Sequence, residues 1–266
     1  MAENFTTGTS GTDTGASGTG TGTGPAAGAG SQGRGSGAVR EPDRRSPLDP
    51  EQTTPLTPEL YDYLLRHNPP LDAVRRRLVD TTYERLGGRA AMQISEEQGP
   101  LLAFLAKLAG ARLIVEVGTF TGMSALWMAE ALPPGGKVIT CDVSEEWTAL
   151  ARAAWTEAGV ADRIDLRIGP ALDTLRALPR EPGVDLAFID ADKENNINYW
   201  EELVPRTRPG GLLAVDNVFL HGRVTDEKAT GAAAAVREFN DHALADERVE
   251  TVMLSVADGL TLARKR

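Results

Sequence analysis

The sequence predicts an α/β protein with a doubly wound, mostly parallel seven-stranded sheet, a C-terminal antiparallel hairpin and an N-terminal helical cap. Two observations carry this prediction. From residue 112 onward, short apolar runs alternate with segments of helical periodicity, and the last two runs are joined by an Asp-Gly pair. Runs that are apolar throughout are typical of parallel strands covered by helices on both faces, and Asp-Gly is typical of a tight hairpin turn.

The first 55 residues are expected to lie outside this domain. Residues 1–40 hold twelve of the 28 glycines of the chain and almost no side chain that could fill a core. Such a Gly/Thr/Ser-rich stretch buries too little apolar surface to offset the entropy of ordering it, so it is predicted to be disordered. Residues 41–55 read as a Pro-rich linker, and the domain is expected over residues 56–266.

Residues 56–110 are predicted to form the helical cap. Thr57 offers a capping hydroxyl and Pro58 suits the first helical position. At the third helix, Ser95 and Gln98 have the spacing of a capping box. The three helices are expected from Thr57, over Leu71–Leu86, and from Ser95 to Gly110.

Residues 111–266 are predicted to form the α/β core. Between the apolar runs, Trp147, Leu150, Ala151 and Ala154 recur at the spacing of a crossover helix. A last helix is expected around Ala232–Leu244. The expected strands are Leu113–Val117, Lys137–Cys141, Ile164–Ile168, Val184–Ile189, Leu212–Val215 and the hairpin of Val249–Val256 with Leu260–Ala263. A ligand of such a sheet binds outside the carboxyl ends of its strands.

Composition excludes several classes of protein. The net charge is −10, and about −8 without the linker and leader, which disfavours a nucleic-acid partner. Cys141 is the single cysteine, so an internal disulfide and a cysteine-based zinc site are excluded. The sequence contains neither a run of roughly 18 apolar residues nor a secretory signal pattern, and a cytoplasmic protein without a membrane partner is expected.

The segment after the first predicted strand suggests a nucleoside site. Gly118 and Gly122 bracket a turn that opens a helix, but their G-x-x-x-G spacing differs from the dinucleotide-binding motif G-x-G-x-x-G, which excludes a nicotinamide dehydrogenase. Asp142 ends the second strand, where a carboxylate can accept both ribose hydroxyls. A nucleoside without a pyrophosphate fits this pair, and S-adenosylmethionine is the candidate. The structural alternative is an ordinary tight turn with a polar strand end.

Polar side chains also end the fourth and fifth predicted strands. Asp190 follows one, and Asp216 and Asn217 follow the other. Adjacent strands would bring these oxygen donors together, and a set of two carboxylates and an amide suits Mg²⁺ or Ca²⁺. Each residue alone could instead be a helix or turn cap. Lys193 lies within reach of such a site and is a candidate general base, with a solvated surface lysine as the alternative.

Other conspicuous side chains are expected to be structural. His221 is a lone loop histidine, and such residues are more often solvated than catalytic. Cys141 lies in a predicted buried strand and is expected to be an inert small hydrophobe. The four tryptophans are expected to pack in the core.

Four motifs together resemble a known family. VEVGTFTG, CDVS, FIDADKEN and AVDNVFLHG are similar to segments of the cation-dependent O-methyltransferases of the caffeoyl-CoA and catechol type. The stretch MQISEEQGPLL also matches the segment that enters the cofactor site of that family. The resemblance runs from about Thr57 to Arg266, which covers the whole predicted domain.

The resemblance implies a class I, Rossmann-like methyltransferase that uses S-adenosylmethionine and Mg²⁺, is homodimeric and acts on vicinal phenolic hydroxyls of a small acceptor. It implies Asp190, Asp216 and Asn217 as metal ligands and Lys193, with Asp190, as catalytic residues. It implies a cofactor site made of Met92, Glu116, Gly118, Ser124, Asp142, Ala171 and Asp190. Asn196 stands where the family usually has tyrosine. The alternatives are a non-catalytic S-adenosylmethionine-binding module and a methyltransferase of nucleic acid.

Overall fold

The structure is a computed structural model that describes residues 54–266. The predicted disordered leader, and all but the end of the predicted linker, lie outside the described residues. Pro55–Arg266 forms one compact unit. It begins with the helices of the predicted cap and continues into alternating strands and helices.

A seven-stranded sheet forms the centre of this unit, in the order β3-β2-β1-β4-β5-β7-β6. The first five strands run parallel to their neighbours, and β7 is antiparallel to both β5 and β6. The predicted doubly wound sheet with a C-terminal antiparallel hairpin is therefore confirmed. The strands are β1 (Leu113–Val117), β2 (Lys137–Asp142), β3 (Ile164–Ile168), β4 (Val184–Ile189), β5 (Thr207–Asp216), β6 (Val249–Leu254) and β7 (Leu260–Lys265).

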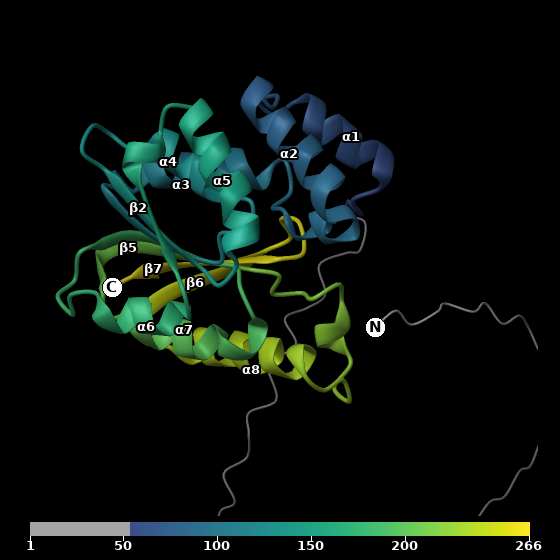
Figure 1. Cartoon of the computed structure of the whole chain (residues 1–266). Helices are drawn as coiled ribbons and strands as arrows, with labels where there is room; N and C mark the ends of the chain where they lie inside the picture. The colour runs from purple at the N-terminus through teal and green to yellow at the C-terminus, as the bar shows by residue number, and fades with distance from the viewer. Residues whose placement is uncertain (1–53) are drawn as a thin grey trace, which may run out of the picture. The chain divides into compact units, whose positions relative to one another are not determined.

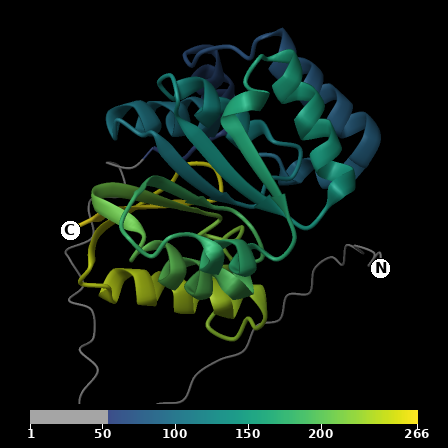
Figure 2. The same cartoon turned by 60° about the vertical axis from the view of Figure 1, so that its left-hand side comes forward.

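Helices cover both faces of the sheet, as Figures 1 and 2 show. One face carries α3 (Gln98–Leu108), α4 (Met123–Ala131) and α5 (Glu145–Glu157), and the other carries α6 (Ala171–Ala177), α7 (Asn196–Leu203) and α8 (Ala232–Ala245). Each face has its own apolar core, with Trp200 and Phe239 on one side and Leu102 and Leu126 on the other. Among residues 54–266, none of the helices combines the length and apolar character that a membrane span requires.

The cap consists of α1 (Pro58–Arg66), α2 (Ala73–Leu86) and a 3₁₀ turn, η2 (Gly87–Met92), that leads into α3. The predicted cap of α1 is confirmed, because Thr57 Oγ1 accepts from Leu60 N over 3.3 Å. The remaining short 3₁₀ turns are η3 (Ala161–Arg163), η4 (Lys193–Asn195) and η5 (Arg223–Thr225).

The predicted start of the third helix is wrong. Helix α3 begins at Gln98 with Glu97 as its N-cap, and the Ser95 hydroxyl has no hydrogen-bond partner among the described residues. Gln98 N instead bonds to the Ser95 carbonyl over 3.2 Å, which makes a turn before the helix and leaves the capping-box geometry unformed. The glutamine thus becomes the first helical residue.

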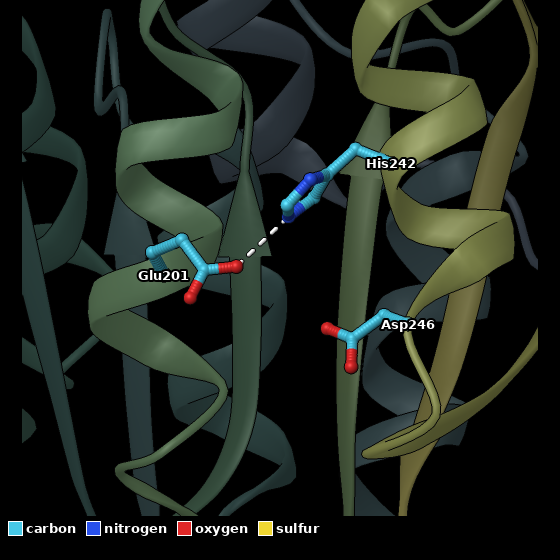
Figure 3. Close-up of side chains that lie close together, drawn as sticks. All are labelled: Glu201, His242 and Asp246. Carbon is cyan, nitrogen blue, oxygen red and sulfur yellow. Dashed lines mark hydrogen bonds and ion pairs between the residues drawn. The ribbon is translucent and has the colours of Figure 1, made fainter.

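An ion-paired cluster joins α7 to the end of α8 (Figure 3). Arg248 donates to both oxygens of Glu201 and to both oxygens of Asp246 over 2.6–3.0 Å. Asp246 also accepts from Trp200 Nε1 over 2.8 Å, and His242 lies 2.8 Å from Glu201. These groups could hold a metal by spacing alone. Because the guanidinium already pairs with both carboxylates, we interpret the cluster as a structural clamp.

Replacing Asp246 by alanine should lower the free energy of unfolding at pH 7 by about 1–3 kcal/mol, because the fully buried Trp200 would keep an unpaired N–H. The hydrogen bonds from Arg248 hold the pKa of Asp246 well below its usual value. The contribution is therefore complete above about pH 4 and is lost as the pH falls through the lowered folded-state pKa. Urea unfolding at pH 7 and pH 3 measures both effects. Asp241→Ala, at an exposed position on α8, is the control, and an equal loss in both variants would contradict the assignment.

Candidate active site

The register of the sheet aligns the ends of four parallel strands. Val117 at the end of β1 pairs with Cys141 of β2 on one side and with Ile189 of β4 on the other, and Ile189 pairs with Val215 of β5. The next residue of each strand therefore lies in one row, Asp142, Gly118, Asp190 and Asp216. Neighbouring strands are about 4.8 Å apart, so Asp190 and Asp216 are adjacent, whereas Asp142 lies two strands away from Asp190, on the other side of Gly118. The chain order reverses between β1 and β4, which is where ligands bind in such sheets.

The two glycines of the turn after β1 are required by packing. Gly118 has φ +96°, and a Cβ there would lie 1.9 Å from the backbone oxygen of Asp190. A Cβ on Gly122 would lie 2.7 Å from the Trp155 ring, whose Nε1 donates to the Gly122 carbonyl over 2.9 Å. Because Gly118 has no Cβ, the turn after β1 can approach the backbone of Asp190 closely, and the ends of β1 and β4 lie against each other.

A cavity of about 860 Å³ opens above this row. The glycine turn, the start of α3 and the segments after β2, β4 and β5 contribute to its wall. Most of the residues predicted for a site line this one cavity, namely Met92, Gly118, Ser124, Asp142, Ala171, Asp190, Lys193, Asp216 and Asn217. The structure therefore brings together side chains that lie more than a hundred residues apart in the sequence.

Asp142 also organises the glycine turn. Its Oδ2 accepts from the backbone N–H groups of Thr119 (3.0 Å) and Phe120 (2.7 Å), and its Oδ1 accepts from Ser144 N (2.8 Å). Each carboxylate oxygen has two lone pairs, so Oδ1 keeps one acceptor position for a ligand hydroxyl. Asp142 can therefore hold the glycine turn and also accept a hydrogen bond from one hydroxyl of a ligand such as a ribose.

Glu116 is the one predicted site residue that does not line the cavity. Its side chain is fully buried behind the glycine turn, where Thr140 Oγ1 donates to it over 2.5 Å and Thr119 continues the chain of hydroxyls. Burial raises the pKa of Glu116 to about 8, with a smaller contribution from the negative charge of Asp190. The contact of Glu116 with a cofactor stays a prediction.

Asp190, Asp216 and Asn217 fit a divalent cation by their chemistry. Asp216 is only 3% exposed, and burial followed by the charge of Asp190 raises its pKa. Two carboxylates held together in a buried row repel each other, and a cation between them would offset both penalties. Asn217, the residue after Asp216, has φ +58°. This left-handed conformation turns the chain out of β5 directly beside Asp216. Carboxylate and amide oxygens are the donors that Mg²⁺ prefers.

Lys193 is held at the same site by an ion pair. Its Nζ donates to Asp190 Oδ1 over 3.0 Å, and both side chains are largely buried. Nearby, Tyr199 OH donates to Asp192 over 2.6 Å, which anchors the turn that carries the lysine. Burial raises the pKa of Tyr199, so this phenol stays a hydrogen-bond donor. Lys193 thus faces the cavity from a fixed position.

The wall of the cavity has a backbone feature that the sequence does not signal. All five non-glycine residues with positive φ among residues 54–266 line the cavity, namely Phe120, Asn217, Leu220, His221 and Ala257. Strained backbone of this kind concentrates at functional sites, and no sequence pattern signals it at residues such as leucine or alanine. Gln98 and Trp147 also line the cavity, although the first was assigned to a helix cap and the second to packing.

The remaining sequence-based expectations are met to different degrees. Cys141 is buried, and burial raises the pKa of its thiol to about 11, as expected of an inert hydrophobe. Trp155 and Trp200 are core residues, whereas Trp127 is only half-buried beneath the guanidinium of Arg75. His221 is exposed at the cavity edge.

Asn196 is buried at the start of α7, and both of its amide atoms lack a partner among the described residues.

Comparison with known proteins identifies the family of this chain. The sequence profile of a family described as O-methyltransferase matches residues 69–266. The chain is 38% identical over 211 residues to probable caffeoyl-CoA O-methyltransferase 1 of Dictyostelium discoideum, covering 77% of this chain and 91% of that protein. It is 41% identical over 226 residues to catechol O-methyltransferase domain-containing protein 1 of Mus musculus, covering 84% of each chain.

A solved structure is similar as well. The O-methyltransferase from Bacillus cereus in complex with SAH superposes with a TM-score of 0.70 at 32% identity, covering 77% of this chain and 96% of that one. The resemblance stated from the sequence motifs is confirmed, and the chain belongs to the O-methyltransferase family.

Proposed function

We propose that the protein transfers a methyl group from S-adenosylmethionine to a hydroxyl of a small catechol-like acceptor, assisted by a divalent cation. The observation that carries this proposal is the row of strand ends. It puts the candidate nucleoside contacts at Asp142 and Gly118 directly beside the candidate cation ligands at Asp190 and Asp216. The similar Bacillus cereus enzyme in complex with SAH supports a cofactor of this class.

In this proposal each part of the cavity has one task. Asp142 accepts from the ribose. The backbone at Gly118 and Ala171 and the side chains of Met92 and Ser124 surround the rest of the cofactor, with Glu116 behind them. S-adenosylmethionine supplies the methyl group, which leaves its sulfur as the new carbon–oxygen bond forms. Asp190, Asp216 and Asn217 hold the cation, which supplies positive charge that favours the ionised form of a nearby hydroxyl.

Lys193 takes the proton of the acceptor hydroxyl at Nζ. To accept it, the amine must first release its own proton to solvent, and a nearby cation favours that neutral form. The neutral amine can keep an N–H hydrogen bond to Asp190 while its lone pair faces the acceptor hydroxyl. A general base placed in this way typically contributes 10²–10⁴-fold to the rate. Much of the remaining acceleration would come from holding both reactants in a fixed orientation on one rigid sheet edge.

The proposed acceptor class rests on the same arrangement. Two adjacent hydroxyls give the acceptor one oxygen to react and a second to orient it, which a monophenol lacks. The cavity of about 860 Å³ must hold both the cofactor and the acceptor, so a small acceptor is favoured. A homodimer and a cytoplasmic location, both implied at the sequence level, remain parts of the proposal.

Incubation with labelled S-adenosylmethionine, Mg²⁺ and a panel of catechols should give label transfer, which EDTA removes and added Mg²⁺ restores. Monophenols should react much more slowly. A nucleic-acid arm of the same assay tests the alternative substrate class, and binding of the cofactor without any transfer would indicate a non-catalytic module. Undiminished methylation by EDTA-stripped protein would contradict the role of the cation.

Lys193→Met should lower kcat by about 10²-fold or more while the affinity for S-adenosylmethionine changes less than about twofold, because proton transfer is removed and the nucleoside contacts are kept. Single-turnover kinetics and titration calorimetry measure the two quantities. Lys228→Met, at an exposed position in the loop after β5, is the control. An unchanged kcat in the Lys193 variant would remove this residue from its role.

Asp142→Asn should weaken cofactor binding by about 10- to 100-fold, since a hydrogen bond to a charged group contributes about 1.5–3 kcal/mol. Calorimetry gives the affinity, and thermal unfolding reports how much the glycine turn depends on the same carboxylate. Asp173→Asn, exposed in the first turn of α6, is the matched control. Unaltered affinity would leave Asp142 with the turn contacts alone.

A further inference from the structure

Gln98, at the start of α3, forms part of the wall of the cavity. It is the first residue of α3, its side chain is 0% exposed, and it lines the cavity together with the candidate cation ligands. Neither Nε2 nor Oε1 has a hydrogen-bond partner of ordinary geometry among residues 54–266. A buried polar atom without a partner is destabilising, so a side chain kept in this state within a cavity wall requires an explanation.

The neighbour of this amide is the Asp216 carboxylate. The two side chains lie beside each other, and Oδ1 of Asp216 accepts from Asn217 N over 2.8 Å. An ionised carboxylate can only accept, whereas the amide nitrogen has two hydrogens to donate. The amide nitrogen of Gln98 is therefore chemically suited to donate to the Asp216 carboxylate, which already accepts from one backbone N–H.

We propose that Gln98 is a positioning residue for Asp216, whose amide fixes the orientation in which that carboxylate binds the cation. This inference rests on the proposed function, because it gives Gln98 a task only if the cation site exists. Polar groups that orient ligating carboxylates typically contribute about 10- to 100-fold to metal affinity. The N-terminal segment thereby influences the proposed cation site through Gln98, the first residue of α3.

A second glutamine in the same segment offers a matched control. Gln93 also lines the cavity and also has a buried, unpaired Oε1. Its Nε2, however, donates to the Ala90 carbonyl over 3.3 Å, so its amide is engaged with the cap backbone. Methionine has nearly the volume of glutamine without its polar ends, and Gln98→Met and Gln93→Met therefore remove comparable groups.

The experiment measures binding of Mn²⁺ alone to the full chain, by the electron paramagnetic resonance signal of the free ion, and the melting temperature without metal. Gln98→Met should weaken Mn²⁺ binding by about 10- to 100-fold, and Gln93→Met should change it less than about twofold. Affinity for S-adenosylmethionine should be preserved in both. Because the Gln98 amide is unpaired, Gln98→Met without metal should melt at or above the wild-type temperature.

The outcomes separate the two proposals. Wild-type Mn²⁺ affinity in Gln98→Met, or a variant that melts earlier or fails to fold, would show that the amide has no positioning role or a purely structural one, and either result overturns the inference. If the wild-type protein itself has no saturable Mn²⁺ site, the proposed cation dependence fails first, and the assignment of Gln98 fails with it.

Discussion

The register of four parallel strands is the constraint on which the rest of the site depends. Val117, Cys141, Ile189 and Val215 pair in one row, so the residues after them must also lie in one row. Slipping one strand by a residue would move its side chains to the other face of the sheet. Gly118 makes the row possible, since any Cβ there would collide with the Asp190 backbone. A packing requirement thus determines which carboxylates become neighbours.

The three carboxylates of the row are stabilised by different partners, which gives the cavity two chemically distinct halves. Asp142 is surrounded by backbone N–H groups, so its charge is compensated before any ligand binds. Asp190 is paired with Lys193, an interaction that can be exchanged. Asp216 accepts from one backbone N–H, and burial followed by the negative charge of Asp190 raises its pKa. The half around Asp142 therefore suits a neutral sugar, and the half around Asp216 suits a cation.

The strand ends that form this row could be predicted from the sequence, whereas several of the side-chain contacts could not. Strand ends could be predicted because apolar runs stop at Asp142, Asp190 and Asp216, and the alternation of strands and helices implied that these ends meet. The start of α3 was misplaced because the capping-box spacing of Ser95 and Gln98 is a local signal, whereas a tertiary position in the cavity wall decides the conformation. The burial of Glu116 behind the turn also depends on how the layers pack, which periodicity does not encode.

The part of the cavity wall formed by the loop after Asn217 depends on the sheet edge made by β7 and β6. Leu220 and His221 have positive φ and follow β5, and the turn between β6 and β7 supports them, because Phe219 N donates to the Asp258 carbonyl and His221 N to the Asp258 carboxylate. Only glycine fits at position 259, where a Cβ would lie 2.6 Å from the Phe219 ring. Since non-glycine residues hold a left-handed conformation only when their surroundings impose it, the antiparallel hairpin does more than close the sheet. It supplies the contacts that keep the loop after Asn217 in its strained shape, and so connects the C-terminal strands to the wall of the cavity.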